Sequence, residues 1–231
     1  MSWILRLLIL VLLLVWLSRQ VRKPSGALGR RFVRAMGVGH AAMTDWALQQ
    51  VTIPKDGVIL DVGCGGGRTV NKLAGLAPQG RVVGLDYSAA SVAVSRNTNA
   101  QEMQTGRVQI EEGSVAALPF PDGTFDAVTA VETHYYWPDL PANVREVLRV
   151  LKAGGMFALV AETYRGGPFR FLYGIIMPLL GAAFLSDSEH RDLLTQAGFT
   201  EVETKHVSGK NWILATGRRP TPTQGANIKV T

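Results

Sequence analysis

Short apolar runs alternate with helical stretches along most of the chain from residue 57 onward. The apolar runs, which predict β-strands, are 58–62, 81–86, 108–111, 125–131 and 156–161. The stretches between them that predict helices are 69–76, 89–103 and 142–151. Strands that alternate with helices in this way indicate a parallel sheet covered by helices, and therefore an α/β fold.

The C-terminal part of the pattern differs, because two strands follow each other directly. Ser186, with Glu189 three residues later, forms a capping box that predicts a helix ending at Gly198. Residues 200–207 and 211–216 then flank a Ser-Gly-Lys turn and predict an antiparallel hairpin. The expected sheet therefore has seven strands and is mostly parallel, with an antiparallel final strand.

Two further segments are almost wholly apolar and fall outside this alternation. Residues 3–17 carry a single charged residue, Arg6, and predict an N-terminal hydrophobic helix. As a helix, residues 1–17 would span about 25 Å, which is at the short end of what crosses a bilayer. The second segment, 169–185, is interrupted by Pro178. We interpret it as a hydrophobic lid or a surface that dips into a membrane, with a buried helix pair as the alternative.

The N-terminal segment is open to three interpretations. A cleaved signal peptide fits the apolar run, but the basic sequence after Leu17 offers no small-residue cleavage site. A helix lying in the membrane interface would need a polar face, which this segment lacks. We favour an uncleaved anchor formed by residues 3–17. The basic residues that follow would then lie on the cytoplasmic side of the membrane, together with the folded body.

The charge distribution supports this division of the chain. The protein has 231 residues and a formal net charge of +6. Seven basic residues precede residue 35, whereas the first acidic residue is Asp45. Residues 36–231 hold 17 basic and 18 acidic residues, so the body is nearly neutral and gives no sign of a nucleic-acid surface. The single cysteine, Cys64, excludes an intrachain disulfide.

A glycine-rich loop follows the first predicted strand. The segment from Asp61 to Gly67 has four glycines in its last five positions, which let the backbone turn tightly and let a ligand approach the next helix. The nicotinamide fingerprint G-x-G-x-x-G, begun at Gly63, would require glycine where this chain has Arg68. A cofactor other than a dinucleotide is therefore favoured, and a nicotinamide-dependent oxidoreductase is the alternative.

Four segments in register carry a family resemblance along residues 55–162. They are Ile59–Gly67, Val83–Ser88, Leu118–Asp126 and Arg145–Phe157. Together they resemble the class I S-adenosylmethionine-dependent methyltransferases, and are most similar to the small-molecule branch of ubiquinone and menaquinone methyltransferases. The resemblance implies a Rossmann-like, doubly wound fold, S-adenosylmethionine as cofactor and methyl transfer to a small molecule. An apolar acceptor at the membrane is our hypothesis.

The resemblance also implies a set of cofactor-binding residues. Asp86 would accept hydrogen bonds from the ribose hydroxyls, and the glycine loop would pack against the amino-acid and ribose portions. Ser114 stands where the family often has an acid to accept from the adenine amine, so this chain would offer a weaker, neutral acceptor there. The full set is Asp61, Gly63, Cys64, Gly65, Gly67, Asp86, Tyr87, Ser114, Val115 and Glu132.

The acceptor side is expected beyond the fourth predicted strand. His134 is a general-base candidate by location and intrinsic pKa, with a positioning role as an equal alternative. Tyr135 and Tyr136 could wall the pocket, and Glu132 could either contact the cofactor or cap the strand. His40 and Trp46 could close over the site. The four histidines and the cysteine show no metal-ligand spacing, so no metal is expected.

These expectations divide the chain into parts. A non-catalytic, membrane-tethered scaffold that keeps the cofactor fold is a further alternative to the methyltransferase. The expected parts are a membrane anchor with a basic flank (1–24), a helical cap (25–54), the methyltransferase domain (55–217, with an apolar insertion or lid at 163–185) and a flexible tail (218–231).

Overall fold

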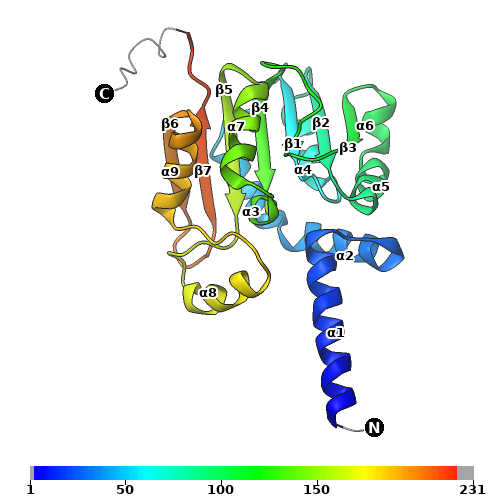
Figure 1. Ribbon diagram of the computed structural model, residues 1–231. Helices are drawn as coiled ribbons and strands as arrows, with labels where there is room; N and C mark the ends of the chain where they lie inside the picture. Colours follow the sequence, from blue (N-terminus) through cyan, green and yellow to red (C-terminus); the bar gives the residue numbers. More distant parts are fainter. Residues whose placement is uncertain (1–2, 223–231) are drawn as a thin grey trace.

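A seven-stranded sheet forms the centre of the protein in the computed structural model (Figure 1), which describes residues 3–222 apart from the side chains of 4, 7, 8, 10–15 and 17. The strand order is β3-β2-β1-β4-β5-β7-β6. Only β7 runs antiparallel to its neighbours. The strands are β1 (Val58–Val62), β2 (Arg81–Asp86), β3 (Val108–Glu112), β4 (Phe125–Val131), β5 (Leu151–Ala161), β6 (Thr200–His206) and β7 (Ile213–Arg218).

Helices cover both faces of this sheet, which confirms the doubly wound, Rossmann-like fold. Side chains of α7 and α9 share one apolar layer with the sheet, and those of α3, α4 and α5 share the other. The helices are α1 (Trp3–Arg22), α2 (Gly26–Gly39), α3 (Ala41–Gln49), α4 (Arg68–Leu76), α5 (Ala89–Thr98), α6 (Ala100–Gln104), the 3-10 helix η1 (His134–Tyr136), α7 (Leu140–Val150), α8 (Arg170–Leu179) and α9 (Asp187–Ala197).

Most predicted boundaries hold, and the exceptions have local causes. The capping box at the start of α9 is present, with both reciprocal hydrogen bonds between Ser186 and Glu189. The single helix expected over 89–103 is instead two helices. They meet at the buried Asn99, whose side-chain amide donates to the carbonyl oxygens of Gly67 (3.0 Å) and Ser95 (2.9 Å). That side chain fastens the glycine loop to the helix layer.

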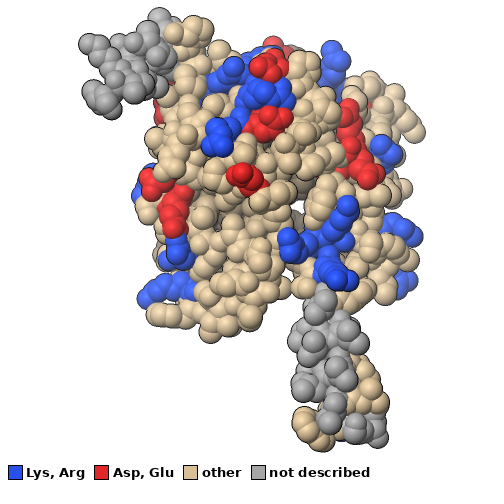
Figure 2. All heavy atoms as spheres, viewed as in Figure 1, with Lys and Arg blue, Asp and Glu red and all other residues tan. Residues whose placement is uncertain are grey.

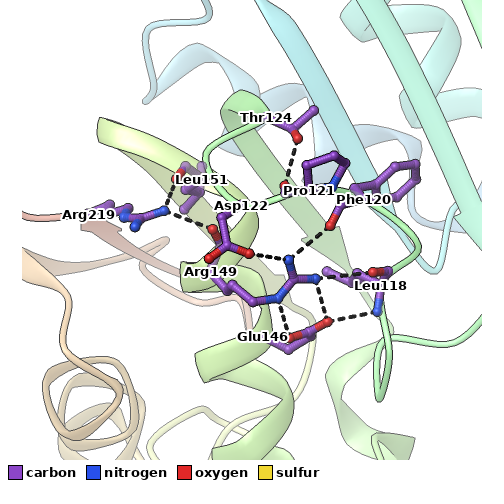
Figure 3. Close-up of polar contacts among 9 residues, drawn as sticks. All are labelled: Leu118, Phe120, Pro121, Asp122, Thr124, Glu146, Arg149, Leu151 and Arg219. Carbon is purple, nitrogen blue, oxygen red and sulfur yellow. Dashed lines mark hydrogen bonds and ion pairs between the residues drawn. The ribbon is translucent and has the colours of Figure 1, made fainter.

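The segments before and after β4 are fastened to each other by Arg149 of α7 (Figure 3). Its guanidinium donates to the carbonyl oxygens of Leu118 (3.1 Å) and Phe120 (2.9 Å), and it pairs with the carboxylates of Asp122 and Glu146. Glu146 in turn accepts from the backbone N–H of Leu118 at 2.9 Å. This network, the Arg149 clamp, holds the loop that leads into β4.

The two ends of the chain leave the sheet differently. β7 continues through Arg218, and the Arg219 side chain donates to the carbonyl oxygen of Arg149 at 2.8 Å, so the predicted flexible tail is held at its beginning. Residues 223–231 of that tail lie outside the described residues. At the other end, α1 extends away from the body (Figure 1). Within residues 3–222, no helix has the length and hydropathy needed to cross a membrane, so the expected transmembrane helix is not supported.

Candidate functional site

A cavity of about 400 Å³ lies at the carboxyl ends of the parallel strands. The chain proceeds from β1 towards β3 on one side and from β4 towards β5 on the other, so the sheet reverses its winding between β1 and β4. Such switch points are where open α/β sheets bind ligands. The cavity is lined by the glycine loop, the ends of β2 and β4, the start of α3 and parts of α1, α2 and α8.

The glycine loop forms the floor of the cavity. Gly63 has a φ of +73°, and a Cβ there would lie 2.0 Å from the Thr133 hydroxyl oxygen, so only glycine fits. Gly65 also has a positive φ, of +51°, but nothing lies within 4 Å of its Cβ position. Cys64 lines the cavity, yet its thiol is buried beside the Ser95 hydroxyl (3.7 Å) and burial raises its pKa. The cysteine is therefore a packed residue rather than a nucleophile.

Asp86 lies at the end of β2 and lines the cavity. Its two carboxylate oxygens accept from the backbone N–H groups of Gly65 and Ser88, each at 2.9 Å, and the residue lines the cavity. Burial raises the pKa of Asp86, while these hydrogen bonds act in the opposite direction. A carboxylate offers about four lone-pair sites, so Asp86 can still accept from hydroxyl groups of a ligand.

The remaining predicted cofactor residues divide into two groups. Tyr87, Ser114 and Val115 line the cavity, with the Ser114 hydroxyl accepting from the backbone N–H of Ala116 at 3.2 Å. Asp61 and Gly67 are not among the residues that line it.

Asp61 and Gly67 instead hold the loop from behind. Asp61 is 1% exposed and accepts from the Thr129 hydroxyl at 2.6 Å, and burial raises its pKa to about 7. A Cβ on Gly67 would meet the side chains of Ser95 and Asn99 at 2.3 and 2.4 Å. Both residues therefore support the glycine loop from outside the lining of the cavity.

Glu132 begins the acceptor side, immediately after β4. Its backbone has a φ of +58°, which is rare for a residue other than glycine and marks strain that tends to occur at functional sites. Its Oε1 accepts from the Tyr135 hydroxyl at 2.8 Å and from the backbone N–H of Glu162. These two donors fix the carboxylate, and burial raises its pKa to about 7.

His40 joins two carboxylates at the edge of the cavity. Its Nε2 lies 3.4 Å from Oε2 of Glu162 and 3.8 Å from Oε2 of Glu132. Burial lowers the pKa of His40, and the charge of Glu162 raises it by less. The ligand-type atoms of these three residues lie within 4.8 Å of one another, so the group could act in proton transfer or hold a cation. We call it the His40 cluster.

The sequence predicted for His40 only that it could close over the site, and it gave no role to Glu162. The three members come from the α2–α3 junction, the end of β4 and the end of β5. Glu162 follows the fifth strand directly, and a polar residue at the carboxyl end of a parallel strand is the signal that could have found it.

His134 lies in the core, away from the residues that line the cavity. It is 1% exposed, it does not line the cavity, and its ring lies 4.3 Å from that of Tyr135 and 5.5 Å from that of His190. Neither ring nitrogen has a hydrogen-bond partner among the described residues, and burial lowers its pKa well below the usual value. The structure therefore does not support His134 as the base, because a base must reach the proton that it removes, and a positioning role for His134 stays a prediction.

Tyr135 and Tyr136 both line the cavity, but in different settings. The Tyr135 hydroxyl is occupied, since it donates to Glu132 and accepts from the backbone N–H of Thr163 at 3.1 Å. The ring of Tyr136 lies 5.4 Å from the guanidinium carbon of Arg22, at the end of α1. Trp46 does not line the cavity and packs against Trp212 at 6.1 Å. The two tyrosines form walls of the site.

The residues present fit a cofactor with a nucleoside and an amino-acid portion. The open space above Gly65 leaves room for a bulky group next to the backbone, and Asp86 stands beside it as an acceptor. The volume of the cavity is within the range of small-molecule sites, which is about 300–1,000 Å³.

Comparisons with known proteins agree with this geometry. The family described as "Methyltransferase domain" matches residues 60–159. A demethylmenaquinone methyltransferase of Geobacillus sp. (strain WCH70) is 31% identical over 191 residues, which cover 72% of this chain and 80% of the relative. A demethylmenaquinone methyltransferase of Shouchella clausii is 28% identical over 204 residues, 78% of this chain and 86% of the relative.

A solved structure shows the same fold at greater distance. Human N-acetylserotonin methyltransferase in complex with S-adenosylmethionine superposes with a TM-score of 0.70 at 19% identity, and the match covers 84% of this chain and 56% of that one.

The fold and the site thus define an S-adenosylmethionine-dependent methyltransferase. The chain belongs to the class I family of these enzymes and resembles its ubiquinone and menaquinone branch. S-adenosylmethionine is its cofactor, and the nicotinamide alternative is not supported.

Proposed function

We propose that this enzyme methylates a quinone-type acceptor with an apolar body at the cytoplasmic face of a membrane. The observation that carries the proposal is the wall of the cavity beyond β4, where Tyr135, Tyr136, Trp137 and Met177 surround the acceptor side. Aromatic walls of this kind pack against a flat ring through offset or edge contacts. The relatives named as demethylmenaquinone methyltransferases support the same class of acceptor.

His40 accepts the proton in this proposal. When bound, S-adenosylmethionine supplies a methyl group that its positive sulfur has already activated. A ring carbon or hydroxyl that receives this group must lose a proton, which a positioned base removes. The lowered pKa of His40 keeps the imidazole neutral and able to accept. Once protonated, it is stabilised by the carboxylate of Glu162, 3.4 Å away, and it also lies 3.8 Å from Oε2 of Glu132.

The N-terminal helix holds the enzyme at the membrane surface in this proposal. Support comes from the apolar sequence of α1 and from Trp3 and Trp16, which are 73% and 42% exposed to solvent. Tryptophans at the two ends of an apolar helix suit the membrane interface. The seven basic residues before residue 35 favour the cytoplasmic side for the folded body.

The test uses the full chain in lipid vesicles with methyl-labelled S-adenosylmethionine. Two acceptors are compared, a demethylated quinol with a prenyl tail and the same quinol without a tail, and products are identified by mass spectrometry. We expect labelled product from the tailed quinol. Asp86→Asn should reduce the rate, and Asp192→Asn, an exposed residue of α9, is the matched control that should not.

Two outcomes would contradict the proposal. Transfer to the tail-less quinol alone would show that the acceptor need not be apolar. No transfer to either quinol, or to any molecule extracted from native membranes, would favour the non-catalytic scaffold.

A further inference from the structure

The outward side of α8 is apolar, although it faces solvent. Phe171, Leu172, Ile175 and Leu179 are between 55 and 81% exposed, and we call them the outer face of α8. On the inward side, Met177 is 5% exposed and packs in a cluster with Tyr135 and Tyr164. A helix that is apolar on both sides normally has both sides covered. The outer face therefore needs a partner that accepts large apolar side chains.

The charges around this face point to an anionic partner. Residues 3–44 and 163–186, which include α1, α2 and α8, hold nine basic residues and no acidic one, and one of the nine, Arg165, is paired with Glu189 of α9. In the view of Figure 2, basic side chains lie near α8 and where α1 meets α2, and acidic ones lie higher on the body. Such an arrangement fits the surface of a bilayer that contains anionic lipid.

A groove at the base of α1 has matching chemistry. It has a volume of about 860 Å³ and lies between the end of α1 and the start of α5. Its basic lining residues and the tryptophan beside them are Arg19, Arg22, Lys23, Arg30 and Trp16. Among the residues that the structure describes, no acidic one lines it, so it offers cationic and aromatic groups suited to phospholipid headgroups.

The base of α1 is fixed to the cofactor side of the cavity. The Tyr87 hydroxyl donates to the carbonyl oxygen of Arg22, and the Ser88 hydroxyl donates to that of Pro24 at 2.7 Å. Arg22 also reaches the loop after α8, with its Nη1 3.8 Å from the Cβ position of Gly181. The groove and the outer face of α8 are therefore held on either side of one edge of the cavity.

We propose that the outer face of α8 inserts into the interface of an anionic phospholipid bilayer while the groove at the base of α1 binds headgroups. The cavity is lined by Val21 and Arg22 from α1 and by Met177 from α8, so its edge then faces the lipid. A lipophilic acceptor enters from the membrane between these two helices. This entry route rests on the proposed function, whereas the docking surface does not.

A fluorescent probe on α8 tests the docking surface directly. In the full chain, Ile175→Cys is labelled with nitrobenzoxadiazole, and Leu76→Cys on α4, 44% exposed, is the matched control. Cys64 is buried and its thiol has a raised pKa, so it should not compete for the label. We expect a blue shift and quenching by doxyl lipids at position 175 in phosphatidylglycerol vesicles, a weaker signal in phosphatidylcholine vesicles, and neither signal at position 76.

The entry route is tested with the double variant Ile175→Asp/Leu179→Asp. The KM for the tailed quinol in anionic vesicles should rise at least roughly tenfold, since burying one such side chain contributes on the order of a factor of ten. Turnover of the tail-less quinol should stay unchanged, which also shows that the variant is folded.

The outcomes separate the two proposals. A probe that stays in water in anionic vesicles, or gives equal signals in both kinds of vesicle, would overturn the docking surface. A blue shift without vesicles that grows with protein concentration would assign the face to a second copy of the chain and overturn it as well. Failure of the proposed function would instead leave the probe signal intact with no quinol methylated.

Discussion

The cofactor side and the acceptor side of the cavity are built in different ways. On the cofactor side, the glycine loop and Asp86 are held by backbone hydrogen bonds and by buried residues behind them. On the acceptor side, the walls are side chains from segments far apart in sequence, and one of those segments, α8, exposes apolar residues. The cofactor side is thus held in place mainly by hydrogen bonds of the backbone. The acceptor side is formed by side chains.

The largest effect should come from a side chain added at Gly63, where the glycine loop of the cofactor side meets Thr133. Gly63→Val places side-chain atoms where the Thr133 hydroxyl lies, 2.0 Å from the Cβ position, at a backbone φ of +73°. The loop must shift, and misplacement by about 1 Å can cost on the order of 10²-fold in rate. We expect activity to fall by at least that factor, with binding of S-adenosylhomocysteine lost in calorimetry. Unchanged binding would show that the loop does not cradle the cofactor.

A second comparison separates His40 from His134. His40→Gln should lower kcat by roughly 10²–10⁴-fold, as expected for loss of a general base. His134→Phe keeps the volume of the core side chain and removes two unpartnered nitrogens, so stability should change by less than about 1.5 kcal/mol. Its kcat should stay within about threefold, because His134 does not line the cavity. A threefold change corresponds to about 0.7 kcal/mol of barrier.

Rate–pH profiles and thermal unfolding check these two variants. If His134→Phe loses activity while folding normally and His40→Gln does not, the assignment of the base is reversed.

The buried carboxyl behind the glycine loop predicts a pH effect on stability. Asp61 keeps its proton up to about pH 7 in the folded protein but loses it near pH 4 when unfolded. The folded state binds more protons in this window, so the Asp61 contribution to stability falls as the pH rises from about 4 to 7. Asp61→Asn should remove this contribution, which is at most about 4 kcal/mol.

Urea unfolding of both proteins across this pH range measures the difference. The buried histidines change stability in the opposite direction, since their lowered pKa values make the unfolded state bind more protons below about pH 6.5, but they are common to both proteins and cancel. Parallel curves would show that Asp61 is ionised throughout.

The smallest effect concerns a glycine that the site does not need. Gly75 lies inside α4 with nothing within 4 Å of its Cβ position and no positive φ. Gly75→Ala should raise the free energy of unfolding by about 0.5–1 kcal/mol, because alanine loses less conformational freedom in a helix. Activity should not change. A loss of activity would show that the helix after the glycine loop must flex during turnover.

Sequence periodicity and motifs were sufficient for the sheet and for locating the glycine loop. Strands with apolar runs and a loop with four glycines are local signals, so their places could be assigned without knowing the packing. His134 could not be placed in this way, because one turn of 3-10 helix directs it into the core while Tyr135 and Tyr136 face the cavity. The His40 cluster depends on contacts between residues more than 90 positions apart, which no local pattern reports.

The Arg149 clamp affects what sequence similarity to this family reports. Its partners, Leu118, Phe120, Asp122 and Glu146, belong to two of the segments that resemble the family, yet none of them lines the cavity. Similarity in these segments therefore reports that the scaffold is assembled, not that methyl transfer occurs. A descendant that kept the clamp and lost His40, the proposed base, would still match the family over residues 60–159, because residue 40 lies before that range.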